Sequence, residues 1–194
     1  MPWIGPTLAL VAYLLGSVSF AILVAARHGV DPRTEGSHNP GATNVGRLVG
    51  KGAGRLVLVL DALKGFAPAL AARLVLGGDH PLTAITAVAA VMGHVLPLWH
   101  GFRGGKGAAT AAGALLAVVP WAGATAALVF VVLKKATRRA SVGSLGGALS
   151  GALLTLGLEG PGVLSAMAGA IFLIVLLRHV DNLGRLLRGE EPPS

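Results

Sequence analysis

Lysine and arginine residues mark every second connection between the apolar segments of this chain. Seven apolar segments can be read from the sequence, at residues 3–26, 56–77, 82–99, 107–119, 121–133, 142–158 and 161–177. All Lys and Arg residues except Lys64 and Arg73 lie in the connections 27–55, 100–106 and 134–141 or in the tail 178–194. The turns near 77–80, 119–121 and 159–161 hold none. This alternation is typical of a chain that crosses a membrane repeatedly and keeps its basic loops in the cytoplasm.

The composition also indicates a membrane protein. Of the 194 residues, 54% are hydrophobic and 12% are charged, whereas soluble domains carry about 25% charged residues. We therefore predict one all-α domain over residues 1–194, a polytopic integral membrane protein. We expect about seven transmembrane helices, an N-terminus outside and a C-terminus in the cytoplasm. No basic stretch precedes the first apolar segment, which favours a span over a signal peptide.

One break leaves the number of helices open. Segments 107–119 and 121–133 share the stretch VVPWAG at 118–123 and could form a single kinked helix. Together they are long for one span and short for two. We predict two helices.

Several functional classes lose support from composition. The chain has no cysteine, which excludes a thiolate nucleophile and a Cys-based metal site. The net charge of +8 is explained by membrane topology, and aromatic residues make up only 5%, so nucleic-acid binding is not expected. No acidic cluster is visible that would hold Mg²⁺, so we expect no metal and no cofactor. The 29 glycines suit close helix contacts in lipid.

The first basic connection contains the motif GSHNPGATNVGR at 36–47. It is rich in Gly, Asn, Ser and Thr, and such a turn exposes backbone N–H groups that can form an anion-binding nest. The alternative is a solvated loop of ordinary turn residues. Its hydroxyl and basic side chains favour a site, because a turn by itself requires neither.

The second motif is HGFRGGKGAAT at 100–110, which places Lys106 among Gly104, Gly105 and Gly107. Glycines let a backbone approach a ligand closely, and a helix N-terminus beside a lysine favours phosphate. It is not a Walker A loop, because His100 and Gly107 stand where that motif needs Gly and Ser or Thr. A flexible turn between helices is the alternative.

The third motif is RHVDNLGRLLRGEE at 178–191. His179 and Asn182 are three residues apart and would share one face of a helix. An amphipathic, basic end held at the membrane surface explains the pattern equally well.

Polar residues also occur inside or at the ends of the apolar segments. Asp61 and Lys64 are three residues apart in the second segment, which favours a structural ion pair over a functional site. His94 and His100 flank the end of the third segment and are predicted to be structural.

The three motifs, in this order and between apolar spans, closely resemble the PlsY family, with LLGSVSF at 14–20 and LDALKG at 60–65 adding to the match. These are bacterial membrane acyl-phosphate:glycerol-3-phosphate acyltransferases. The resemblance implies seven spans in the inner membrane, with motif loops 27–55, 100–107 and 178–191 on the cytoplasmic side. It implies transfer of a fatty acyl group from a long-chain acyl phosphate to the 1-hydroxyl of sn-glycerol 3-phosphate. The products are lysophosphatidic acid and inorganic phosphate, in the first acylation of phospholipid synthesis.

The resemblance also implies residue roles. The catalytic set is Ser37, Arg47, Lys106, His179 and Asn182; the further substrate contacts are Gly41, Thr43, Asn44, Gly104, Gly105, Gly107 and Ser144. Lys106 would hold phosphate, Arg47 and Ser37 the glycerol phosphate, and His179 and Asn182 would orient it. The general base stays open between His179 and a substrate phosphate oxygen. The acidic residue of the third motif falls on Glu190, with Glu191 as the alternative.

Two other classes remain as rivals. An anion transporter could use a lysine and glycines in a bundle, but transporters commonly show internal repeats, and none is visible here. A lipid-binding scaffold without chemistry is the other. Acyltransferases that use acyl-CoA resemble one another in a His-x₄-Asp motif, and no histidine of this chain has Asp five residues later. The expected partners are the two substrates and membrane lipid.

Overall fold

Apolar segments fold as helices because a helix satisfies its own backbone hydrogen bonds where no water is available. The computed structural model describes residues 2–194, and among these it contains helices and no strands. The elements are, in chain order, α1 (Ile4–Gly16), α2 (Phe20–Ala26), α3 (Ala42–Leu48), α4 (Lys51–Leu76), α5 (Pro81–Val95), the 3-10 helix η1 (Leu98–His100), α6 (Ala108–Val118), α7 (Pro120–Thr137), α8 (Ala140–Glu159), α9 (Val163–Leu177) and α10 (Val180–Leu187). Each predicted apolar segment contains a helix.

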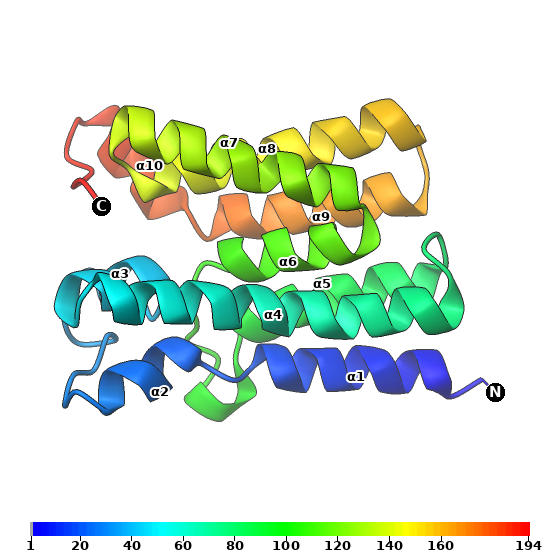
Figure 1. Ribbon diagram of the computed structural model, residues 1–194, viewed down its shortest axis with the longest axis horizontal. Coiled ribbons are helices and arrows are strands. Elements are labelled where there is room, and N and C mark those ends of the chain that lie inside the picture. Colours follow the sequence, from blue (N-terminus) through cyan, green and yellow to red (C-terminus); the bar gives the residue numbers. More distant parts are fainter. Residues whose placement is uncertain (1) are drawn as a thin grey trace.

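The longer helices lie along one axis of the molecule (Figure 1). Helices α2, α3 and α10 and the C-terminus lie at one end, on the left of the view, and the N-terminus lies at the other. The turns that join α4 to α5, α6 to α7 and α8 to α9 lie at the N-terminal end. The connections without Lys or Arg thus share the N-terminal end, and the basic connections lie toward the opposite end, as their alternation along the chain predicts. Which side of the membrane each end faces stays a prediction.

Helix boundaries differ from the predicted ones in three places. The first apolar segment is interrupted at residues 17–19, where the Ser19 hydroxyl accepts a hydrogen bond from Ile22 N (3.5 Å) and caps α2. α4 begins at Lys51, five residues before its predicted start. The loop 27–55 is not irregular throughout, because it contains α3. These are polar or glycine-rich stretches, where hydropathy alone does not mark helix ends.

The break at 118–123 separates two helices, as predicted. α6 ends at Val118, and α7 begins at Pro120, which occupies the first helical position. Proline suits that position because its missing N–H would have no partner there.

By length and apolarity, three helical segments can each cross a membrane: Ile4–Ala26, Pro81–His100 and Ala140–Glu159. α9 and α10, which meet at a bend of 59°, make a fourth candidate if they are counted as one broken span. The count of seven spans stays a prediction.

The helices approach one another through small residues, as the glycine content predicts. A methyl group at Gly65 of α4 would lie 2.9 Å from the carbonyl carbon of Thr110, and one at Gly113 of α6 would lie 2.8 Å from that of Ala62. Large apolar side chains face outward instead: Leu74 is 76% exposed and Leu128 is 64% exposed. An exterior of this kind suits lipid, because soluble proteins rarely expose large continuous apolar areas.

The predicted orientation can be tested by labelling cysteines in this Cys-free chain. Lys51→Cys lies at the basic end and should react with an impermeant maleimide only after the membrane is opened. Asp79→Cys lies in the α4–α5 turn and should react in intact cells; both side chains are exposed. The reverse pattern would contradict the orientation.

Candidate functional site

A cavity of about 830 Å³ opens among the three sequence motifs. Its lining includes all five predicted catalytic residues, Ser37, Arg47, Lys106, His179 and Asn182. It also includes five of the predicted substrate contacts: Gly41, Thr43, Asn44, Gly107 and Ser144. Residues that are more than 140 positions apart in the chain therefore meet in one site.

Lys106 extends from the glycine-rich loop and lines the cavity. Gly107 follows it in the left-handed conformation (φ 77°), which a side chain rarely adopts, and α6 begins at the next residue. Lys106 Nζ donates a hydrogen bond to Asn182 Oδ1. Burial lowers the pKa of Lys106 to about 8, although the Glu191 carboxylate opposes this effect. The amine is therefore cationic at neutral pH and close to its titration range.

Gly104 and Gly105 do not line the cavity, and their backbones approach α5 where the sequence predicted an approach to ligand. A methyl group at Gly104 would lie 2.7 Å from the Val95 carbonyl oxygen, and one at Gly105 would collide with His94 Nε2. On the other side, Arg178 donates to both of their carbonyl oxygens, from Nη2 to Gly104 (3.1 Å) and from Nε to Gly105 (3.3 Å). These glycines let the loop fit between His94 and Arg178.

His179 stands at the N-terminal boundary of α10, and Asn182 lies within this helix. Both side chains are buried. His179 Nδ1 lies 2.8 Å from the Val175 carbonyl oxygen. A carbonyl only accepts hydrogen bonds, so Nδ1 carries the proton and Nε2 is left as an acceptor. Burial lowers the pKa of His179 to about 4, so the ring is neutral at pH 7.

Glu190 and Glu191 both line the cavity, but Glu191 is the buried carboxylate that contacts other residues of the site. Its carboxylate accepts hydrogen bonds from Ser141 Oγ (2.8 Å), Asn182 Nδ2 (2.5 Å) and Arg185 Nε (2.8 Å). Burial alone would raise its pKa, but these hydrogen bonds and the Arg185 charge hold that pKa below its usual value. Glu190 is exposed and pairs with Arg188 at 2.7 Å. The sequence placed these two carboxylates side by side and could not show which one turns inward.

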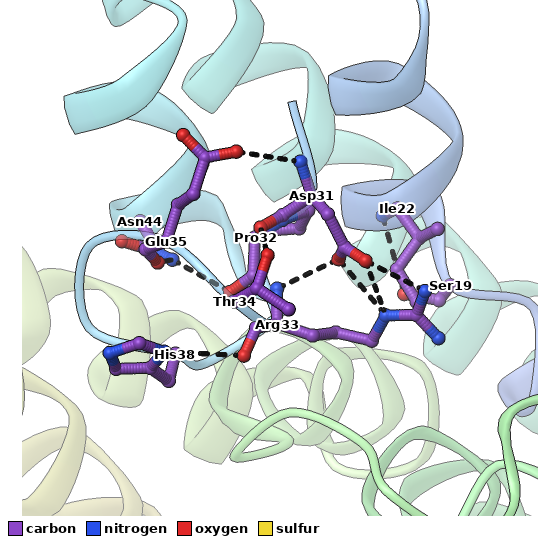
Figure 2. Close-up of polar contacts among 9 residues, drawn as sticks. All are labelled: Ser19, Ile22, Asp31, Pro32, Arg33, Thr34, Glu35, His38 and Asn44. Carbon is purple, nitrogen blue, oxygen red and sulfur yellow. Dashed lines mark hydrogen bonds and ion pairs between the residues drawn. The ribbon is translucent and has the colours of Figure 1, made fainter. Parts of the chain in front are cut away.

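The loop before α3 is braced from within (Figure 2). Asn44 is 1% exposed, and its Nδ2 donates to the carbonyl oxygens of Pro32 and Glu35, each at 3.0 Å. Its Oδ1 accepts from the backbone N–H of Ser37 at 2.9 Å. The Asn44 amide is thus occupied by the loop, and this geometry gives it a positioning role beside Ser37.

The same loop contains an ion pair at its outer edge. Figure 2 shows the contact between Arg33 and Asp31. The Arg33 Nη2 and Asp31 Oδ2 atoms lie 2.8 Å apart. The hydrogen bond from the Arg33 side chain lowers the pKa of Asp31 to about 2, so the pair persists at physiological pH.

The C-terminal residues line the cavity and bind to Arg47 and to residue 138. Arg47 Nη2 donates to the Pro193 carbonyl oxygen at 2.6 Å, and Ser194 N donates to the Arg138 carbonyl oxygen at 2.8 Å. Glu191, Pro192 and Ser194 line the cavity. Arg47 is exposed, so its guanidinium can exchange the carbonyl partner for a phosphate.

Asp61 and Lys64 form the predicted ion pair, with Lys64 Nζ 2.9 Å from Asp61 Oδ1. Both are buried, and Lys64 also donates to the carbonyl oxygen of Val18 at 2.7 Å, in the break between α1 and α2. Asp61 and His94 line the inner wall of the cavity. Over residues 2–194, no group of three or more His, Asp or Glu side chains is arranged to hold a metal ion.

Comparison with known proteins connects this geometry to a family. The family model described as glycerol-3-phosphate acyltransferase matches residues 7–189. The protein named glycerol-3-phosphate acyltransferase of Anaeromyxobacter dehalogenans strain 2CP-1 is 45% identical over 194 residues, covering 97% of this chain and 96% of its own. That of Thioalkalivibrio sulfidiphilus is 44% identical over 186 residues, covering 95% and 91%.

Two solved structures have the same fold. Both are of PlsY, described as an integral membrane glycerol 3-phosphate acyltransferase, and both are 40% identical to this chain. The glycerol 3-phosphate form has a TM-score of 0.95 and covers 98% of this chain and 95% of its own. The lysophosphatidic acid form has a TM-score of 0.92 and covers 97% and 94%.

The lowered pKa of Lys106 predicts how anion binding depends on pH. The ammonium is charged below about pH 8 and neutral above it, so the affinity for inorganic phosphate should fall about tenfold between pH 7 and pH 9. Calorimetric titration in detergent measures this. Lys106→Arg is the control, because a guanidinium keeps its charge. Its profile should show only the ionisation of phosphate itself, and the decline in the wild-type protein is measured relative to it. An equal decline in Lys106→Arg would assign the titration to another group.

Proposed function

Because the chain belongs to the glycerol-3-phosphate acyltransferase family, we propose that it transfers a fatty acyl group from an acyl phosphate to the 1-hydroxyl of sn-glycerol 3-phosphate. The products are 1-acyl-glycerol 3-phosphate, which is lysophosphatidic acid, and inorganic phosphate. This is the first acylation in phospholipid synthesis. The enzyme acts as a multi-pass protein of the bacterial inner membrane, with its motif loops toward the cytoplasm.

One observation carries the proposal: the cavity lining combines polar residues of the three motifs with apolar residues of the helices. Lys106, Arg47 and His179 belong to the polar part. Apolar residues of four helices continue the lining: Leu58, Val59 and Ala62 of α4, Ala111, Ala112 and Leu115 of α6, Ala126, Ala127, Phe130 and Val131 of α7, and Gly147 and Ala148 of α8. A lipid chain gains about 0.8 kcal/mol for each buried CH₂ group. Such a cavity suits two phosphate-bearing substrates, of which one carries a long acyl chain and the other does not.

The side chains of the site also support an acyl phosphate as the acyl donor. An acyl phosphate is a mixed anhydride with a good leaving group, so it needs positioning and charge stabilisation more than a protein nucleophile. The chain has no cysteine, and the site offers cations and amide groups instead. Lys106 and Arg47 supply positive charge, and the start of α6 supplies backbone N–H groups.

The reaction is a single displacement at the acyl carbon. The 1-hydroxyl oxygen forms a bond to the carbonyl carbon of the acyl phosphate, and the bond from that carbon to the bridging oxygen breaks. Inorganic phosphate leaves with the bonding electrons, and the hydroxyl proton passes to a phosphate oxygen. Lys106 stabilises the negative charge that develops on the leaving phosphate, in addition to binding it before reaction.

His179 positions the nucleophile. With a pKa of about 4, it is a weak base at neutral pH, whereas a phosphate oxygen has a pKa near 6. This difference favours a substrate phosphate oxygen as the proton acceptor. The free Nε2 of His179 accepts a hydrogen bond from the substrate, and Asn182 keeps Lys106 in place through their hydrogen bond.

Phosphate release in a reconstituted assay tests the function and the role of Lys106 together. Purified protein given palmitoyl phosphate and glycerol 3-phosphate should release phosphate and form lysophosphatidic acid. Lys106→Ala should lower kcat/KM on the order of 10²-fold or more and should lower kcat itself, because it loses a transition-state contact. Lys106→Arg should recover part of the loss, since the charge returns without the compact geometry.

The outcomes separate the rival classes. A transporter or a lipid-binding scaffold would release no phosphate above the uncatalysed rate. If Lys106→Ala kept a normal kcat and changed only KM, Lys106 would be a binding residue, and the catalytic cation would be Arg47.

The apolar part of the cavity lining generates a prediction about the acyl chain. Ala112 of α6 belongs to this part, and Ala112→Phe should narrow the cavity beside it. The variant should raise KM for palmitoyl phosphate several-fold while leaving KM for glycerol 3-phosphate near its normal value, because only one substrate carries a chain. Leu128→Phe, on the exposed face of α7, is the matched control. Equal kinetics for both variants would place the acyl chain elsewhere.

A further inference from the structure

A buried group of side chains lies directly beneath the glycine-rich loop and is not used in the reaction above. His94 of α5 lies 3.0 Å through Nδ1 from Thr110 Oγ1 and 3.6 Å from Asp61 Oδ1. His94 is 7% exposed, Asp61 2% and Thr110 0%. Three helices, α4, α5 and α6, thus meet at one imidazole.

The loop contacts His94 in two ways, through the main-chain carbonyl group of His94 and through its ring. Gly105 N donates to the His94 carbonyl oxygen at 3.2 Å. The His94 ring occupies the space beside Gly105, where a methyl group would collide with Nε2. Arg178 holds the Gly104 and Gly105 carbonyl groups from the other side. Gly105, the residue directly before Lys106, is therefore held from two directions: its N–H by His94 and its carbonyl group by Arg178.

We propose that His94, held by Asp61 and Thr110, is a positioning residue for the Gly104–Lys106 loop and so sets where Lys106 Nζ lies in the cavity. The inference rests on the proposed function for its kinetic consequence, since Lys106 is the cation that meets the leaving phosphate. The contacts themselves are independent of it. They also give the Asp61–Lys64 pair a second task beyond mutual neutralisation, because Asp61 touches His94 as well as Lys64.

The lysine depends on this support because its own chain neighbours are glycines. Gly105 and Gly107 flank Lys106 and place little restriction on its backbone. A catalytic group that shifts by about 1 Å can lose on the order of 10²-fold in rate. Tertiary contacts on the loop must therefore supply the precision that the local sequence does not.

Kinetics of His94 variants give the first test. His94→Ala should lower kcat/KM on the order of 10²-fold, mainly through kcat, while kcat of Lys106→Ala should not fall further when His94→Ala is added. His94→Asn should recover part of the loss, because its amide can replace Nδ1 in the bond to Thr110. His100→Ala is the control on the neighbouring 3-10 helix and should retain activity within about twofold, since His100 does not line the cavity.

Hydrogen exchange gives a readout that does not depend on activity. In His94→Ala, peptides covering residues 101–107 should exchange faster, while those covering 82–93 of α5 keep their protection. Thr110→Val removes one partner of the ring with little change in volume, so it provides a milder variant if His94→Ala folds poorly. It should shift exchange and kcat in the same direction by a smaller factor.

A double-variant cycle tests the contact between ring and loop. Gly105→Ala alone should impair activity because its methyl group meets the imidazole. In the His94→Ala background the ring is gone and only the Pro40 carbonyl oxygen, at 3.0 Å, stays close, so the second change should cost less. Multiplicative effects, or unchanged exchange in residues 101–107, would overturn the proposal. Absence of any acyl transfer by the wild-type protein would refute the proposed function, and the exchange data would still decide the positioning role.

Discussion

Many large apolar side chains face the outside of this bundle, so water exclusion does not hold the helices together as it does in a soluble protein. In lipid, helices associate by close packing and by interhelical hydrogen bonds. Here the glycines at 65 and 113 bring the backbones of α4 and α6 into direct contact. The buried apolar core consists largely of alanine and valine, with few larger residues such as Leu115 and Ile171. A core this tight leaves little room for large polar side chains, and most of them lie at the motif-loop end.

The exceptions inside the bundle show what a buried charge requires. Lys64 pairs with Asp61 and donates a hydrogen bond to the Val18 carbonyl oxygen. This oxygen is not used in a helical hydrogen bond, because α1 ends before it. Removing one partner from a buried ion pair costs about 3–5 kcal/mol, since the other charge stays buried and unpaired. The interruption of the first apolar segment therefore serves the ion pair. The pair in turn touches His94, and His94 touches the glycine-rich loop.

Several parts of the site follow from residue types and order alone. The three motifs predicted a polar site between spans, and all five residues assigned to catalysis line one cavity. Other parts do not follow. Ser141 and Arg178 hold the site together through contacts with residues 50 and more than 70 positions away, and local spacing carries no signal for them. Glu190 and Glu191 are adjacent residues of the same type, and only the fold buries Glu191 and leaves Glu190 exposed.

By itself, the sequence determined the helical class, the division into apolar segments, the two helices at Pro120 and the gathering of basic connections at one end. These properties depend on hydropathy, charge and proline, which act locally along the chain. Only the tertiary structure explains why residues 104 and 105 are glycines. The sequence suggested room for a ligand, whereas the fold shows a backbone pressed between His94 and Arg178. The reason is physical: a glycine shows only that space is scarce or that φ is unusual, and the neighbour that takes the space comes from another helix.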